Sequence, residues 1–123
     1  MSYEFYKIMH LTGVILVFTG LVGLLTIKMS GGALVGKTKM LVFASHGVGL
    51  LLALVGGFGL MARLGMAQSM PTWIYGKLII WFILGGAIAL IKRKANIGGL
   101  LYGGLIAIFL VASYLAVIKP FTV

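Results

Sequence analysis

The chain has 123 residues, of which 62% are hydrophobic and 9% are charged. Soluble domains are only about 45–50% apolar, so this composition excludes a water-soluble globular protein. The chain contains ten Lys and Arg side chains, a single acidic residue, Glu4, and no Cys. Disulfides, zinc–thiolate sites, cysteine nucleophiles and catalysis by a pair of carboxylates are therefore excluded.

Four long apolar segments follow one another along the chain. They span residues 6–28, 40–62, 72–92 and 97–119. A helix needs about 20 apolar residues to cross a bilayer core of about 30 Å, and each segment meets that length. The connecting loops are short, which makes neighbouring helices antiparallel. We therefore predict one transmembrane domain over residues 1–123, an all-α integral membrane protein folded as a four-helix up-down bundle.

The positive charges are distributed unevenly between the two ends of this predicted bundle. Loops 29–39 and 92–96 and their borders carry Lys28, Lys37, Lys39, Lys92, Arg93 and Lys94, whereas Lys7, Lys77, Arg63 and Lys119 belong to the other side. The positive-inside rule predicts that both loops are cytoplasmic and both termini lie outside, in the periplasm if the membrane is a bacterial inner membrane. Contact with the lipid bilayer explains these charges better than binding to nucleic acid.

Nineteen glycines occur in the chain, several of them about one helical turn apart. Examples are Gly20 with Gly23, Gly56 with Gly59, and Gly99 with Gly103. Such spacing indicates close packing between transmembrane helices. A second interpretation is that the glycines leave room for a flat cofactor between helices.

Three ionisable residues lie within the predicted spans: His10, His46 and Lys77. Ionisable groups are costly inside a membrane and indicate function. His10 and Lys77 are expected at the same depth, whereas His46 enters from the opposite face, roughly 15 Å from His10 at 1.5 Å per residue. One haem iron would not be held by both histidines. We interpret His46 as a structural histidine, with Tyr102 as a candidate partner, and as a weaker candidate metal ligand.

Aromatic residues flank the His10 and Lys77 positions at helical spacing. Trp73 and Trp81 lie one turn on either side of Lys77, and Tyr6 lies one turn before His10. A Trp at this depth is also typical of an interface anchor, and a Lys of a side chain that reaches outward to the membrane surface. We predict a site with His10 and Lys77 at its centre, surrounded by Tyr6, Trp73, Trp81 and Tyr114.

Three stretches of the sequence carry a resemblance to a known family. They are Tyr6-Lys7-Ile8-Met9-His10-Leu11, Val55-Gly56-Gly57-Phe58-Gly59-Leu60 and Trp73-Ile74-Tyr75-Gly76-Lys77-Leu78. In this order they resemble the HemJ-type four-helix membrane protoporphyrinogen oxidases and related haem-binding membrane proteins. The sequence departs from the family between Gly20 and Ser30, where the family's Leu-Pro-Arg element is missing. The chain is thus similar to a divergent member that keeps the fold and the haem.

The resemblance implies a small haem-associated membrane protein that contains haem b. It implies that His10 binds the haem iron and that His10 and Lys77 are both needed for activity. If the chain is an enzyme, the resemblance predicts an oxidoreductase acting on porphyrin; otherwise it predicts an electron carrier. The alternative, from a different class, is a noncatalytic structural subunit whose glycine-rich faces pack in a homo-oligomer or a larger membrane complex.

Overall fold

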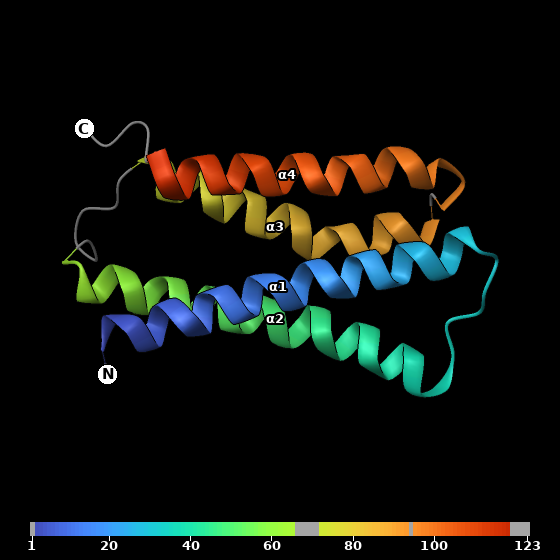
Figure 1. Ribbon diagram of the computed structural model, residues 1–123, viewed down its shortest axis with the longest axis horizontal. Coiled ribbons are helices and arrows are strands. Elements are labelled where there is room, and N and C mark those ends of the chain that lie inside the picture. Colours follow the sequence, from blue (N-terminus) through green and yellow to red (C-terminus); the bar gives the residue numbers. More distant parts are fainter. Residues whose placement is uncertain (1, 66–71, 94, 119–123) are drawn as a thin grey trace.

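The computed structural model describes residues 2–65, 72–93 and 95–118 and contains four long helices. These are α1 (Tyr3–Met29), α2 (Gly36–Arg63), α3 (Thr72–Arg93) and α4 (Gly98–Ile118), with a short 3-10 helix, η1 (Ala95–Ile97), before α4. Each long helix has the length and apolar character needed to cross a membrane. Successive helices run in opposite directions, with α1 beside α2 and α3 beside α4 (Figure 1). The predicted all-α fold, a four-helix bundle of membrane-spanning helices, is confirmed.

The two ends of the bundle differ in the chain segments that they contain. The N-terminal end holds the start of α1, the end of α2, the start of α3 and the end of α4 (Figure 1). The opposite end holds the basic loops of the sequence, and we call it the basic end. The candidate functional residues are divided between these two ends.

Two helices begin earlier than the apolar segments predicted. Helix α1 starts at Tyr3 because the Ser2 hydroxyl caps it, accepting a hydrogen bond from the Phe5 amide at 3.2 Å. Helix α2 starts at Gly36 instead of residue 40, so Lys37 and Lys39 belong to its first turns. Apolar character marks the part of a helix that crosses the hydrocarbon, but the hydrogen-bonded helix continues into the polar border.

Helix α1 ends in a turn that depends on glycine. The Gly31 amide donates to the Lys28 carbonyl at 3.2 Å, and the Gly32 amide donates to the Ile27 carbonyl at 2.9 Å. This pair of bonds is the Schellman motif, which requires a left-handed residue just after the helix. Gly31 supplies it with a φ of +78°. The chain therefore turns sharply at the membrane border toward α2.

The closest contact in the bundle is between α1 and α2, and it is made through glycines seven residues apart on each helix. A Cβ atom added to Gly49 would lie 2.6 Å from the Val17 amide nitrogen, and one added to Gly56 would lie 2.6 Å from the amide nitrogen of His10. Contacts this short leave no space for a side chain, so the two backbones touch. The glycines thus fix the position of α1, including His10, against α2.

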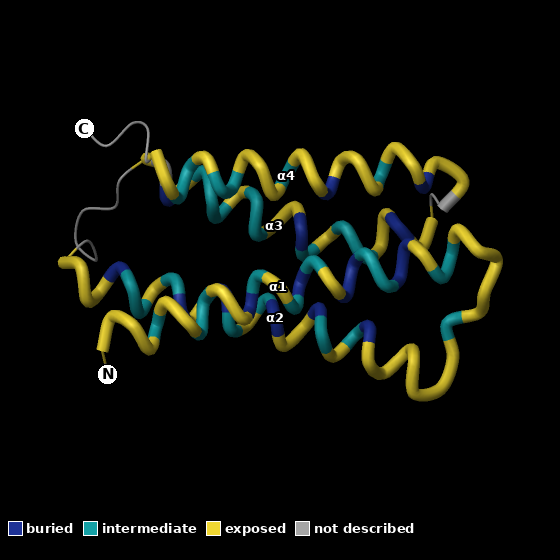
Figure 2. The backbone as a smooth tube through the Cα atoms, viewed as in Figure 1, coloured by how far each residue is buried: buried dark blue, intermediate teal, exposed yellow. Residues whose placement is uncertain are grey.

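The remaining packing is concentrated at the basic end. A cluster of buried side chains joins all four helices there: Val17, Leu21, Leu24, Leu25, Val42, Leu84, Ile91 and Leu105. At the N-terminal end the buried cluster consists of Met61 and Ile74, with Leu115 packed against it. Exposed residues run along much of α4 (Figure 2). The bundle is therefore filled at the basic end and loosely packed at the N-terminal end.

The glycine contact predicts a sharp difference between two substitutions on α2. Gly56→Ala places a methyl group against the His10 backbone, so the helices must separate, and we expect a loss of about 1–3 kcal/mol in the free energy of unfolding, as for other overpacked sites. Gly47→Ala is the matched control, because nothing lies within 4 Å of a Cβ there. Unfolding in detergent followed by circular dichroism measures both. Equal stability of the two variants would contradict the contact.

Candidate functional site

The loosely packed N-terminal end contains a cavity of about 410 Å³. This volume lies within the range of roughly 300–1,000 Å³ that is usual for small-molecule sites. Residues from all four helices line it, and most of them are apolar. The side chains with polar groups among them are Tyr3, Lys7, His10, Lys77, Trp81 and Ser113, and Phe58 and Phe109 are further aromatic lining residues. The cavity is thus an apolar space in the membrane with a few polar groups.

His10 is held in one orientation by α2. Its Nδ1 atom lies 2.7 Å from the Ala53 carbonyl oxygen. A carbonyl oxygen only accepts, so Nδ1 carries the hydrogen and donates it. The ring also lies close to Gly57, where an added Cβ would be 3.4 Å from Nδ1. In the neutral imidazole the other ring nitrogen, Nε2, has the free lone pair and is the atom of His10 able to bind a metal ion or accept a proton.

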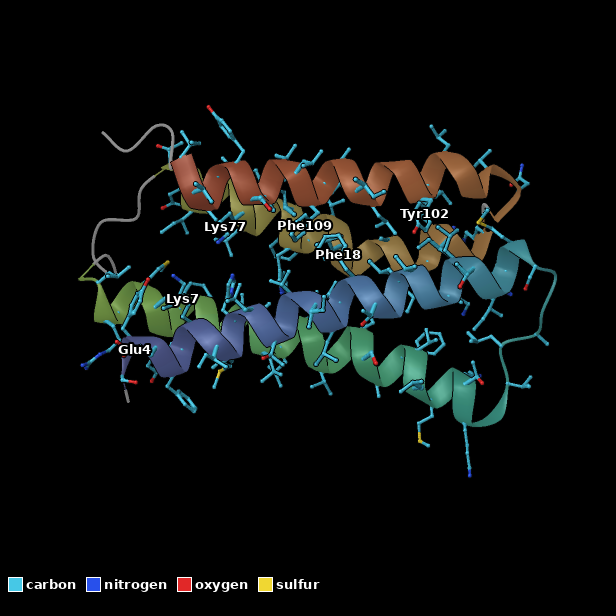
Figure 3. All side chains as sticks on the ribbon, in the orientation of Figure 1. Glu4, Lys7, Phe18, Lys77, Tyr102 and Phe109 are labelled. Carbon is cyan, nitrogen blue, oxygen red and sulfur yellow. The ribbon has the colours of Figure 1, made fainter. Side chains whose placement is uncertain are left out.

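Two lysines give the cavity a positive charge. Lys7 on α1 and Lys77 on α3 both line it, on facing sides of the space between these helices (Figure 3). Lys77 is also near enough to His10 for its charge to act on the imidazole. The described lining residues include no acid, since Glu4 is exposed at the start of α1. The cavity consequently favours a ligand that combines an apolar body with negative charge.

Aromatic side chains form part of the cavity wall. The Trp81 indole nitrogen donates to the Leu50 carbonyl at 3.0 Å, which fixes the indole between α3 and α2. Phe109 of α4 meets Phe18 of α1 edge to face, with ring centroids 5.6 Å apart (Figure 3). Trp81 and Phe109 thus give the cavity flat apolar surfaces whose positions are determined by neighbouring helices.

The cavity includes some of the predicted site residues and leaves out others. His10, Lys77 and Trp81 line it, but Tyr6 packs over Gly59 of α2 and Tyr114 is 53% exposed on α4. Tyr6 faces α2 because it shares the side of α1 that carries the glycine contact. On α4, Ser113 takes the position expected of its neighbour Tyr114. Trp73 lies in α3, and its side chain is outside the described part of the structure.

Two polar lining residues of α1 were not in the predicted site. Tyr3 and Lys7 line the cavity together with His10 and Val14. Their spacing places them on one face of the helix, because residues three, four and seven positions apart lie on the same side. The sequence pattern instead favours the face of this helix that carries Tyr6 and His10, one turn apart, together with the glycines. His10 lies at the border between the two faces, so the sequence does not decide which one faces the cavity.

His46 lies apart from this cavity and is accounted for by packing. It is 5% exposed, and its Nε2 atom donates to the Leu84 carbonyl at 2.9 Å, which joins α2 to α3. The candidate partner Tyr102 is instead 43% exposed and lines a groove between α1 and α4. His10 contacts Gly56, and His46 lies ten residues before Gly56. Ten residues correspond to about 15 Å along α2. The two histidines therefore serve separate parts of the bundle.

Some residues of the cavity could hold a haem. Within the described residues, no three His, Cys, Asp or Glu side chains come together. A haem iron needs only an axial protein ligand, since the porphyrin supplies the other nitrogens, and an imidazole is a common choice. A fixed His10 imidazole, apolar walls and two lysines able to pair with carboxylates meet the requirements of that group.

Comparison with known proteins gives no match to a family model, to a curated protein or to a solved structure. The indications of function come from the residues of the cavity. These residues are a fixed imidazole, two lysines and aromatic walls inside a membrane-spanning bundle.

Proposed function

We propose that the chain is a small haem-associated membrane protein, with the haem in the cavity at the N-terminal end. The observation that supports this most is the hydrogen bond from His10 Nδ1 to the Ala53 carbonyl at 2.7 Å. Histidines that bind metals usually donate their other ring nitrogen to a carbonyl or carboxylate, which fixes the ring and raises the basicity of the ligating nitrogen. His10 has this arrangement, with Nε2 as the ligating atom.

The other lining residues have distinct roles in this proposal. Lys7 and Lys77 bind the carboxylates of the ligand, because they are the cations nearest to His10 in the cavity. Trp81 and Phe109 contact its flat apolar face and exclude water. When bound, a haem supplies one-electron redox chemistry that amino acids lack. The protein residues thus bind and orient it within the membrane.

Two activities are compatible with such a site, and Lys77 has a different role in each. If the chain oxidises a porphyrinogen, the electrons pass to an acceptor such as a quinone of the membrane, and the Lys77 amine in the same cavity as His10 takes up a proton that the porphyrinogen releases. If the chain carries electrons, Lys77 serves only as a partner of the carboxylates or as a second ligand. An anaerobic assay with protoporphyrinogen and an added quinone as electron acceptor separates the enzyme, which forms protoporphyrin with multiple turnovers, from the carrier, which does not.

The haem proposal predicts different outcomes for the two histidines. His10→Gln removes the imidazole but keeps a side chain able to hydrogen-bond Ala53, so we expect haem affinity to fall by about tenfold or more. His46→Gln is the matched control and should keep the haem, because His46 does not line the cavity. Reduced-minus-oxidised spectra of membranes containing each variant give the measurement. Equal haem content in the two variants would argue against His10 as ligand.

We further propose that the membrane is a bacterial inner membrane, with the N-terminal end of the bundle on the periplasmic side. Lys28, Lys37, Lys39, Lys92 and Arg93 lie at the opposite end, and the positive-inside rule assigns that end to the cytoplasm. This orientation opens the cavity toward the periplasmic half of the bilayer.

Because the chain has no Cys, single cysteines test this orientation cleanly. Leu64→Cys and Ser30→Cys each place an exposed thiol at one end of the bundle. A membrane-impermeant maleimide applied to spheroplasts should label Leu64→Cys directly, and Ser30→Cys only after the membrane is permeabilised. The reverse pattern would invert the proposed topology.

A structural subunit or homo-oligomer is the second candidate, and α4 carries the observation that favours it. Nothing lies within 4 Å of a Cβ placed on Gly99, Gly103 or Gly104, and Leu100 is 74% exposed. Small residues on an open face allow another transmembrane helix to approach. Purification in mild detergent tests this: a stoichiometric partner or a dimer supports the second candidate, and a monomer that contains haem supports the first.

A further inference from the structure

The basic end of the bundle gathers positive side chains from three helices. The end of α1, the start of α2 and the end of α3 all lie at this end of the bundle (Figure 1). The described basic side chains at this end are Lys28, Lys37, Lys39, Lys92 and Arg93. The one acidic residue of the chain, Glu4, is at the opposite end, where α1 starts. No acidic side chain of this chain is therefore available to balance these charges.

Like charges at one end of a bundle repel one another unless counterions reduce the field. The start of α2 stands apart from the other helices, and every residue from 36 to 41 is exposed (Figure 2). The charge of Lys92 meets an aromatic ring, with its Nζ atom 5.5 Å from the centroid of Phe43, but this contact supplies no negative charge. Neutralisation must come from outside the chain.

Exposed apolar side chains near these lysines indicate where the lysine amines lie relative to a bilayer. Val35, Met40, Leu41 and Leu100 are between 65% and 74% exposed at this end. Apolar surface of this size belongs in the hydrocarbon of a bilayer. Lys37 and Lys39 come between Val35 and Met40 in the chain. A bilayer that covers these apolar side chains brings the lysine amines, which reach outward on long side chains, to the level of its headgroups.

We propose that the basic end binds the headgroups of anionic phospholipids. Phosphate oxygens accept hydrogen bonds from Lys37 and Lys39 on α2 and from Lys92 on α3, so that one lipid layer neutralises charges on separate helices. The lipid headgroups thereby reduce the repulsion among the basic side chains of this end. This site is at the opposite end of the bundle from the haem cavity and does not depend on it.

The test compares two lipids that differ only in headgroup charge. Purified protein in detergent receives phosphatidylglycerol or phosphatidylcholine with the same acyl chains, and thermal unfolding and lipid retention by native mass spectrometry are measured. We expect phosphatidylglycerol to raise the unfolding temperature by several degrees more than phosphatidylcholine and to be retained preferentially. The triple variant Lys37→Gln/Lys39→Gln/Lys92→Gln should lose this difference, whereas Arg63→Gln at the opposite end should keep it.

Several outcomes would overturn the proposal. Equal stabilisation by the two lipids, or a triple variant that responds like the wild type, would show that the basic end does not select anionic headgroups. Inorganic phosphate is added at the same total charge as phosphatidylglycerol. If it raises the unfolding temperature by the same amount, free anions screen the basic end and lipid binding is not needed. If the triple variant does not fold, lipid retention by the wild type and by Lys37→Arg/Lys39→Arg is the deciding measurement. Preferential retention of phosphatidylglycerol by both supports the proposal, and equal retention of the two lipids overturns it. Haem content is recorded in parallel and has no bearing on either result.

Discussion

The close approach of α1 and α2 through glycines is the contact on which the rest of the structure depends. Gly49 lies against Val17, and Gly56 lies against the backbone of His10, at distances that no larger residue permits. In lipid the hydrophobic effect does not drive helices together, so this packing is the main source of specificity between them. It also places the His10 ring beside the Ala53 carbonyl, which orders the one imidazole of the cavity.

The two ends of the bundle differ in how the space between the helix pairs is filled. Leucine and isoleucine side chains fill the space between the α1–α2 pair and α3 with α4 at the basic end. Fewer large side chains do so at the N-terminal end, and the cavity results. The ends also differ in charge: the cavity places Lys7 and Lys77 beside an imidazole inside the membrane, whereas the basic end places its charges at the membrane surface. One end suits a ligand within the bilayer, and the other suits the lipid headgroups.

Much of the fold could be predicted from the sequence, because the length of an apolar segment and the thickness of a bilayer are directly related. The four helices and their bundle are confirmed. The separation of His46 from His10 was also predictable, since it depends only on the rise per residue and the direction of each helix. The rotation of each helix about its axis was not predictable. Tyr6 and Lys7 are adjacent, yet one packs on α2 and the other lines the cavity. The backbone carbonyls of Ala53 and Leu84, which orient the two histidines, leave no signal in a sequence.

We propose that His10 Nε2 holds a haem iron inside the bundle. Titration of the haem-free protein with haemin, followed through the Soret band, is the decisive experiment. Binding at His10 should give a shifted band that saturates at one haem per chain. A spectrum that stays identical to that of haemin in detergent, at every ratio of haem to protein, would rule this binding out.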